Sequence, residues 1–171
     1  FLHALPGKKL ILKGNHDYWW TTRKKMDAFF AANRWDSLRI VHNDAAAVDG
    51  CVAVCGTRGW FFDAEEDADK KIVMREAGRL QASIDAARAA GLPPVVFLHY
   101  PPVFAGQECS EILEVLRRNG IRRCYYGHVH GPGIRRAVCG DYEGLSLKLI
   151  SADALGFTPL HVPYDRPAAG E

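Results

Sequence analysis

Three short apolar segments of this chain each run directly into a loop that carries histidine. The segments are residues 9–13, 94–98 and 121–126, and the loops after them are Gly14-Asn15-His16-Asp17, His99-Tyr100-Pro101-Pro102 and Gly127-His128-Val129-His130-Gly131. Short apolar runs that end at glycine or polar residues are typical of buried strands. Because the carboxyl ends of parallel strands meet at one edge of an α/β sheet, we expect four of the seven histidines to lie together there.

Helical and strand patterns alternate along the rest of the chain. Apolar residues at spacings of three and four predict helices over residues 22–33 and 64–90. A third helix is predicted over residues 108–118, where Gly120 ends it. Further strands are predicted over residues 38–41, 45–48, 51–55 and 145–149. Asp49-Gly50 suits a type I′ turn and predicts a hairpin, whereas apolar and polar residues alternate in the last segment, which indicates an antiparallel strand. This order predicts an α/β core in a single domain over residues 1–171.

Length and composition exclude several classes of protein. The 171 residues fit one domain, and 48% hydrophobic with 25% charged residues exclude a disordered, collagen-like or coiled-coil chain. The 22 Lys and Arg residues against 20 Asp and Glu residues give a net charge of +2 and occur in separate clusters. We therefore expect no nucleic-acid surface. The apolar stretches fall short of the ~20 residues of a membrane span, which predicts no membrane association.

The five cysteines favour a cytoplasmic location. Their number is odd, they form no C-x-x-C pair, and they lie mostly in or beside apolar segments, which predicts reduced, partly buried thiols. The first residue, Phe1, is not methionine, so we expect the chain to be part of a longer one. The missing signal segment therefore says little about targeting.

The histidine loops have the chemistry of a metal site. Neutral imidazole is a common metal ligand, and two histidines one residue apart, as in His128 and His130, can turn toward a shared centre. The amide oxygen of Asn15 is a hard ligand, and an oxygen and nitrogen donor set without thiolates suits Mn, Fe or Zn. We interpret the remaining histidines as ordinary polar residues: His3, His42 and His161.

The three loops, in this order, resemble the third, fourth and fifth motifs of the calcineurin-like metallophosphoesterases. The resemblance spans residue 9 to about residue 155 and implies a four-layer α-β-β-α sandwich of two mixed sheets. Within the family, Tyr18-Trp19-Trp20 and Gly56-Thr57-Arg58-Gly59-Trp60 are most similar to segments of small bacterial phosphohydrolases. The resemblance therefore implies a metal-dependent hydrolase of phosphomonoesters or phosphodiesters.

The resemblance also implies a role for each residue. The implied ligands of two divalent metal ions are Asn15, His99 and His128 for one ion and His130 for the other. The resemblance further implies that a hydroxide bridging the two ions attacks the phosphorus and that His16 protonates the leaving oxygen as general acid. Asp17 is implied to orient the ring of His16.

The chain departs from the family at its beginning. The first two motifs of the family, Asp-x-His and Gly-Asp-x-x-Asp, supply ligands to both metals, and neither occurs upstream of Lys9. We expect that an N-terminal strand-helix-strand portion is missing. On that account, the 171-residue chain is a partial site that binds metal weakly and turns over poorly.

The role of Arg58 and the nature of the substrate stay open at this point. Arg58 lies between glycines after a predicted strand, where it is equally suited to clamp a substrate phosphate or to be a solvated surface residue. A small phosphate ester and a phosphoprotein are both compatible substrates. No sequence feature fixes the oligomeric state.

Two other functions compete with the hydrolase. One is a binding module that keeps the fold but has lost turnover, although His16 with Asp17 favours the enzyme. The other is a single structural Zn held by His99, His128 and His130. In that case, removal of the metal by EDTA is expected to unfold the domain.

Overall fold

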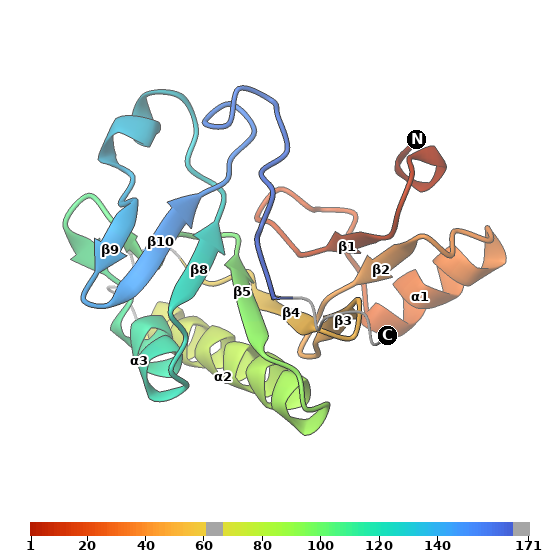
Figure 1. Ribbon diagram of the computed structural model, residues 1–171, viewed down its shortest axis with the longest axis horizontal. Coiled ribbons are helices and arrows are strands. Elements are labelled where there is room, and N and C mark those ends of the chain that lie inside the picture. The colour runs from red at the N-terminus through yellow and green to blue at the C-terminus, as the bar shows by residue number, and fades with distance from the viewer. Residues whose placement is uncertain (61–66, 166–171) are drawn as a thin grey trace.

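A six-stranded mixed sheet forms the centre of the molecule (Figure 1). The computed structural model describes residues 1–60 and 67–165. The strands follow the order β3-β4-β5-β8-β10-β9, with the bounds Ala46–Val48, Val52–Thr57, Pro94–Leu98, Arg123–Tyr126, Leu145–Leu149 and Gly140–Tyr142. β4, β5, β8 and β10 run parallel, so the loops that follow them open at one edge of the sheet.

The two outer strands of this sheet are antiparallel to their neighbours. Asp49 and Gly50 have φ angles of 50° and 70°, which confirms the predicted hairpin between β3 and β4. β10 is antiparallel to β9, as its alternation indicates, but it is parallel to β8. Alternation within a strand reports which of its faces is solvated and not the direction of each neighbour.

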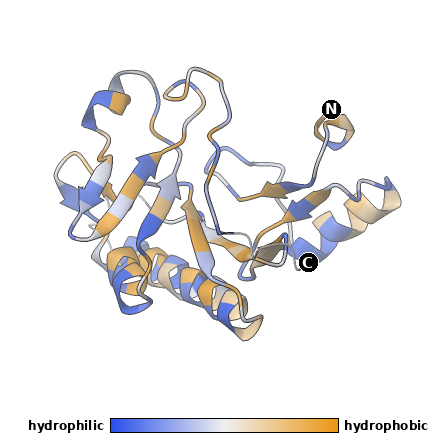
Figure 2. Ribbon diagram, viewed as in Figure 1, coloured by the Kyte–Doolittle hydropathy of each residue, from blue (hydrophilic) through white to orange (hydrophobic). Residues whose placement is uncertain are grey.

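Two helices cover one face of the large sheet (Figure 1), namely α2 (Asp67–Ala89) and α3 (Ser110–Arg118). Ile84 of α2 and Leu116 of α3 are fully buried, and each such side chain stabilises the fold by about 1.5–3 kcal/mol. Figure 2 shows apolar residues along β5 and β10 and on both helices. The spacing of three and four is confirmed for α2, and the third predicted helix is present as α3, while the predicted residues 64–66 lie outside the described residues.

A second, smaller sheet consists of two parallel strands. β1 (Lys9–Ile11) and β2 (Leu38–Ile40) are connected by α1 (Arg23–Ala32). The hydroxyl of Thr22 caps α1, because it accepts a hydrogen bond from the backbone N–H of Lys25 at 3.3 Å. The predicted helix and both predicted strands are thus confirmed.

The small sheet lies between α1 and the large sheet. Leu10 lines an apolar cavity of about 510 Å³ together with Phe97 of β5, whereas its neighbour Ile11 lines a second cavity together with Met26 of α1. Successive residues of a strand point to opposite faces. The layers therefore run helix, sheet, sheet, helix, which confirms the α/β sandwich.

Short elements complete the described chain. β6 (Val103–Phe104) and β7 (Gln107–Glu108) form a small hairpin before α3, so the predicted start of this helix at residue 108 is two residues early. Two 3₁₀ turns lie over Leu2–Ala4 and Gly131–Arg136. All five cysteines are free thiols. Within residues 1–60 and 67–165, no helix is long and apolar enough to cross a membrane.

Candidate metal centre

Three side chains from three separate loops meet at the carboxyl edge of the strands. Asn15 lies after β1, His99 directly after β5, and His128 two residues after β8. The Oδ1 atom of Asn15 lies 2.7 Å from Nε2 of His99, and Nδ1 of His128 lies 3.1 Å from the same Nε2. The structure thus brings together three of the four predicted metal ligands, whose role as ligands stays a prediction.

The chemistry of these contacts fits a cation. A ring nitrogen carries one proton or one lone pair, so Nε2 of His99 cannot form a full hydrogen bond with both neighbours in either orientation of the Asn15 amide. Adjacent ligands of an octahedral ion with bonds of ~2.1 Å lie about 3 Å apart. The observed separations of 2.7 and 3.1 Å are close to that value, so the two contacts to Nε2 of His99 are compatible with shared ligation of one cation.

Both histidines of this cluster favour the neutral form. Burial, followed by the nearby His128, lowers the pKa of His99 to about 4. Burial, followed by His130 and His16, lowers the pKa of His128. Neutral imidazole offers the lone pair that a metal ligand needs. The cluster is therefore ready to bind a cation near neutral pH.

The backbone allows the rings to approach this closely. His128 has a φ of 67°, a left-handed conformation that is uncommon for a residue with a side chain and that clusters at functional sites. Gly131, at the end of the same loop, has a φ of 52°, which glycine adopts without the steric cost of a side chain. A Cβ atom at Gly14 would lie 3.2 Å from Cε1 of His99, so the missing side chain lets this ring pack against the loop after β1.

His130 forms no hydrogen bond with these three side chains. Its side chain is 65% exposed, and its Nδ1 atom lies 3.1 Å from Oδ1 of Asp153. The other oxygen of Asp153 accepts the N–H of Gly131 at 2.8 Å. A carboxylate that binds one ring nitrogen directs the other toward a metal. Sequence reasoning missed Asp153. The alternation in the strand before it predicts an antiparallel strand, and such a strand would end at the opposite edge of the sheet. In the structure β10 is parallel to β8, so the loop that carries Asp153 lies at the same edge as His128 and His130.

His16 and Asp17 both lie in the loop after β1, and each has its own partners. The Nδ1 atom of His16 lies 3.3 Å from the hydroxyl of Tyr18. The carboxylate of Asp17 accepts the N–H of Gly14 at 2.6 Å and the indole N–H of Trp19 at 3.1 Å. In the described part of the chain, Asp17 thus holds the loop and forms no hydrogen bond with His16. The catalytic roles of both residues stay predictions.

Aromatic rings border the centre. The ring centroid of Tyr100 lies 4.3 Å from that of His128 and 5.0 Å from that of His99. The ring centroids of Trp60 and Tyr100 lie 6.3 Å apart, and the guanidinium carbon of Arg58 lies 4.8 Å from the ring centroid of Trp60. Arg58 is therefore half-buried and held over an indole, and its role as a phosphate clamp stays a prediction.

No group of three or more His, Cys, Asp and Glu side chains among the described residues could hold a metal ion. The third donor beside His99 and His128 is the amide of Asn15, which is not of these types. The fourth predicted ligand, His130, is turned to Asp153. The centre thus offers two nitrogen donors and one oxygen donor in contact, with a further histidine nearby.

Comparison with known proteins gives one family. The sequence model described as calcineurin-like phosphoesterase matches residues 1–132, and this segment contains all the predicted site residues. No curated protein and no solved structure gave a significant match.

Proposed function

Because the chain belongs to the calcineurin-like phosphoesterase family, we propose that it hydrolyses phosphate esters at the edge where Asn15, His99 and His128 meet. Membership of the family supports metal-dependent hydrolysis in general, and the proposal extends it to these residues. Divalent cations at such a centre supply a nucleophilic water near neutral pH and neutralise charge on the phosphoryl oxygens. The contact of three donors from three loops is the observation that carries the proposal.

We assign two metal positions to the chain. Asn15, His99 and His128 hold one ion through the atoms that are in contact. His130 holds the other through Nε2, because Asp153 engages its Nδ1 atom. This set of nitrogen and oxygen donors suits Mn, Fe or Zn.

His16 is the proposed general acid. It is exposed, follows Asn15 directly, and has its Nδ1 atom engaged by the hydroxyl of Tyr18. Its Nε2 atom is then available to hold the proton that passes to the leaving oxygen of the ester. Arg58, held over the ring of Trp60, is suited to bind phosphate oxygens through two of its N–H groups.

Metal titration followed by an ester assay tests this function. Isothermal titration of the metal-free chain with Mn²⁺ is expected to show weak binding, because the ligands of the first two family motifs are not among residues 1–171. Slow hydrolysis of p-nitrophenyl phosphate is expected to require the metal. His16→Asn is expected to lower kcat by about 10²–10⁴-fold. It should leave Mn²⁺ binding unchanged, because His16 is not a proposed ligand.

His161→Asn is the matched control, since His161 is exposed and lies outside the centre. Hydrolysis that does not respond to Mn²⁺, or equal effects of the two substitutions, would contradict the proposal. Binding of Mn²⁺ without any hydrolysis by the unsubstituted chain would instead favour a binding module.

A further inference from the structure

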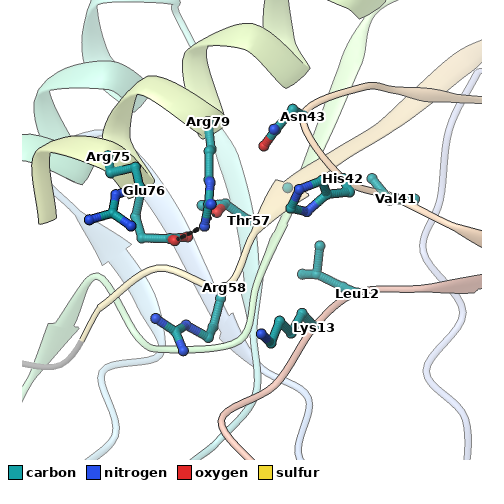
Figure 3. Close-up of a pocket in the computed structure, with 11 residues that line it drawn as sticks. Leu12, Lys13, Val41, His42, Asn43, Thr57, Arg58, Arg75, Glu76 and Arg79 are labelled. Carbon is teal, nitrogen blue, oxygen red and sulfur yellow. Dashed lines mark hydrogen bonds and ion pairs between the residues drawn. The ribbon is translucent and has the colours of Figure 1, made fainter. Parts of the chain in front are cut away.

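A cavity rich in basic side chains lies at the same edge of the sheet (Figure 3). Its volume is about 230 Å³, and its lining comes from the loops after β1 and β2, the end of β4, and α2. We call it the basic pocket and define it by its ionisable side chains: Lys13, His42, Arg58, Arg75, Glu76 and Arg79.

The basic pocket carries an excess of positive charge. Four of its side chains are cationic and one is a carboxylate, which leaves three positive charges uncompensated. Glu76 forms an ion pair with Arg79 at 2.5 Å. Within the described residues, Lys13, Arg58 and Arg75 have no carboxylate partner. A cleft lined by one sign of charge concentrates ligands of the opposite sign.

Glu76 is a buried residue of the pocket lining and is held in place by two hydrogen-bond partners. Its side chain is 1% exposed, and it accepts hydrogen bonds from the hydroxyl of Thr57 and the guanidinium of Arg79. Buried carboxylates are retained where they are paired and hydrogen-bonded. A guanidinium has five N–H donors, so Arg79 is held in place with donors to spare for a ligand. Figure 3 shows Arg75 and Arg79 beside Glu76, with Arg58 and Lys13 across the cavity.

The basic pocket adjoins the candidate metal centre through two segments of the chain. Lys13 precedes Asn15 by two residues. The backbone carbonyl of Thr57 accepts the N–H of His99 at 3.3 Å, so the end of β4 joins the pocket to the centre. A group attached to a phosphate at the centre can therefore reach the pocket.

We propose that the basic pocket binds a second phosphoryl group of the substrate, so that the chain prefers substrates with two phosphates over simple monoesters. Guanidinium groups bind phosphoryl oxygens bidentately, which suits Arg75 and Arg79 of the pocket. The preference for substrates with two phosphates rests on the proposed function, whereas binding of a phosphate anion by the basic pocket does not. The second phosphate has two chemical sources, a further ester on the same molecule or an anhydride such as a nucleoside diphosphate.

Titration of the metal-free chain with inorganic phosphate tests the pocket without hydrolysis. The unsubstituted chain is expected to bind phosphate, and Arg75→Gln is expected to raise the Kd about tenfold or more, because a charge-assisted hydrogen bond is lost. Arg75 is exposed on α2 and forms no hydrogen bond or ion pair with the described residues, so the substitution should not disturb the fold.

Arg122→Gln is the matched control, since Arg122 is exposed and lies before β8, at the other end of the strand from the centre. It is expected to leave phosphate binding unchanged. Absence of phosphate binding to the unsubstituted chain, or the same Kd for both variants, overturns the assignment of the pocket.

Hydrolysis in the presence of Mn²⁺ identifies the substrate class. The quantity measured is the ratio of kcat/KM for a substrate with two phosphates, fructose bisphosphate or adenosine diphosphate, to kcat/KM for p-nitrophenyl phosphate. We expect this ratio to fall about tenfold in Arg75→Gln and to stay constant in Arg122→Gln. The substrate with the larger fall identifies the source of the second phosphate.

The phosphate titration and the hydrolysis assay together distinguish failure of the pocket assignment from failure of the proposed function. An unchanged ratio in Arg75→Gln, with p-nitrophenyl phosphate still hydrolysed, overturns the preference for two phosphates and leaves the hydrolase intact. Phosphate binding that depends on Arg75, without hydrolysis of any ester, supports the pocket and counts against the hydrolase.

Discussion

Asp153 holds three groups beside the candidate metal centre. Its Oδ2 atom accepts the backbone N–H of Gly131, whereas Oδ1 accepts the N–H of Ala154 and lies 3.1 Å from Nδ1 of His130. The N–H of Gly131, followed by His130, holds the pKa of this carboxyl below its usual value. Asp153→Ala is expected to weaken Mn²⁺ binding about 10–100-fold, because His130 loses its orientation. Isothermal titration measures the change.

The control for this substitution is Glu114→Ala, which removes an exposed carboxylate from α3 and is expected to leave metal binding unchanged. If Asp153→Ala binds Mn²⁺ as tightly as the unsubstituted chain, then the carboxylate does not position a ligand.

Single residues show what a sequence reveals about a site and what it hides. Asn15, His99 and His128 can be recognised because each follows an apolar strand in a short polar loop. Asp153 has no such signal, since its place depends on which strand lies beside β8. The positive φ of His128 is hidden as well, because the glycines around it are the expected positions for a turn.

At the scale of elements, Asp44 ties α1 to β2. Its carboxylate lies 3.1 Å from the guanidinium groups of both Arg23 and Arg39 and accepts the backbone N–H of His42. Burial raises the pKa of Asp44, but the N–H of His42 and the two guanidinium groups lower it more. The folded pKa therefore lies below the ordinary value of 3.8.

This pairing predicts a pH-dependent stability. A carboxyl whose pKa is lowered by folding contributes stability above its unfolded pKa, and the contribution is lost as the pH falls through the folded pKa. Asp44→Asn is expected to reduce the free energy of unfolding by about 1 kcal/mol at pH 7. The difference should narrow below about pH 4. Urea unfolding at pH 7 and pH 3 measures it.

Asp36→Asn serves as the comparison, because Asp36 is exposed in a turn and forms no ion pair with the described residues. An effect of Asp44→Asn that is the same at both pH values would show that charge is not its cause.

The long elements of this fold can be predicted from periodicity, and the short ones cannot. The helices α1 and α2 follow from apolar residues at spacings of three and four. β6 and β7 have two residues each, too few for any period to show, and their pairing takes residue 108 out of the predicted helix. The parallel partner of β10 depends on the tertiary fold and not on its own pattern.

At the scale of the whole molecule, the apolar core and the candidate metal centre occupy different places. Core residues such as Leu80, Ile84 and Leu113 belong to one cluster with residues of β4, β5, β8 and β10, whereas the centre lies in loops at the edge. The chain is therefore expected to stay folded in EDTA. Mn²⁺ at 100 times its Kd is expected to raise the free energy of unfolding by about 2.7 kcal/mol.

Circular dichroism during heating measures both expectations, with EDTA in one sample and Mn²⁺ in the other. Loss of helical signal in EDTA at room temperature would contradict them and would favour a structural Zn site.

The overall architecture can be predicted from the order of strands and helices, but the basic pocket cannot. Its cations stand at positions 13, 58, 75 and 79, in three separate segments of the chain. Each of them alone resembles an ordinary surface residue. The packing of α2 against β4, with the loop after β1 beside them, brings these cations around one cavity.

Because β4, β5, β8 and β10 are parallel, the loops of the proposed site lie at one edge of the large sheet, and the opposite edge carries none of the proposed site residues. Gly91, in the turn that enters β5, is exposed and has no atom within 4 Å of the position where a Cβ would lie. The five residues of β5, with a length of about 16 Å, separate this turn from His99. A fluorescent reporter inserted at the turn is therefore expected to lie away from the candidate metal centre. An attachment at this turn is thus expected to leave the candidate metal centre open to the solution, so that the immobilised protein can be screened against libraries of substrates.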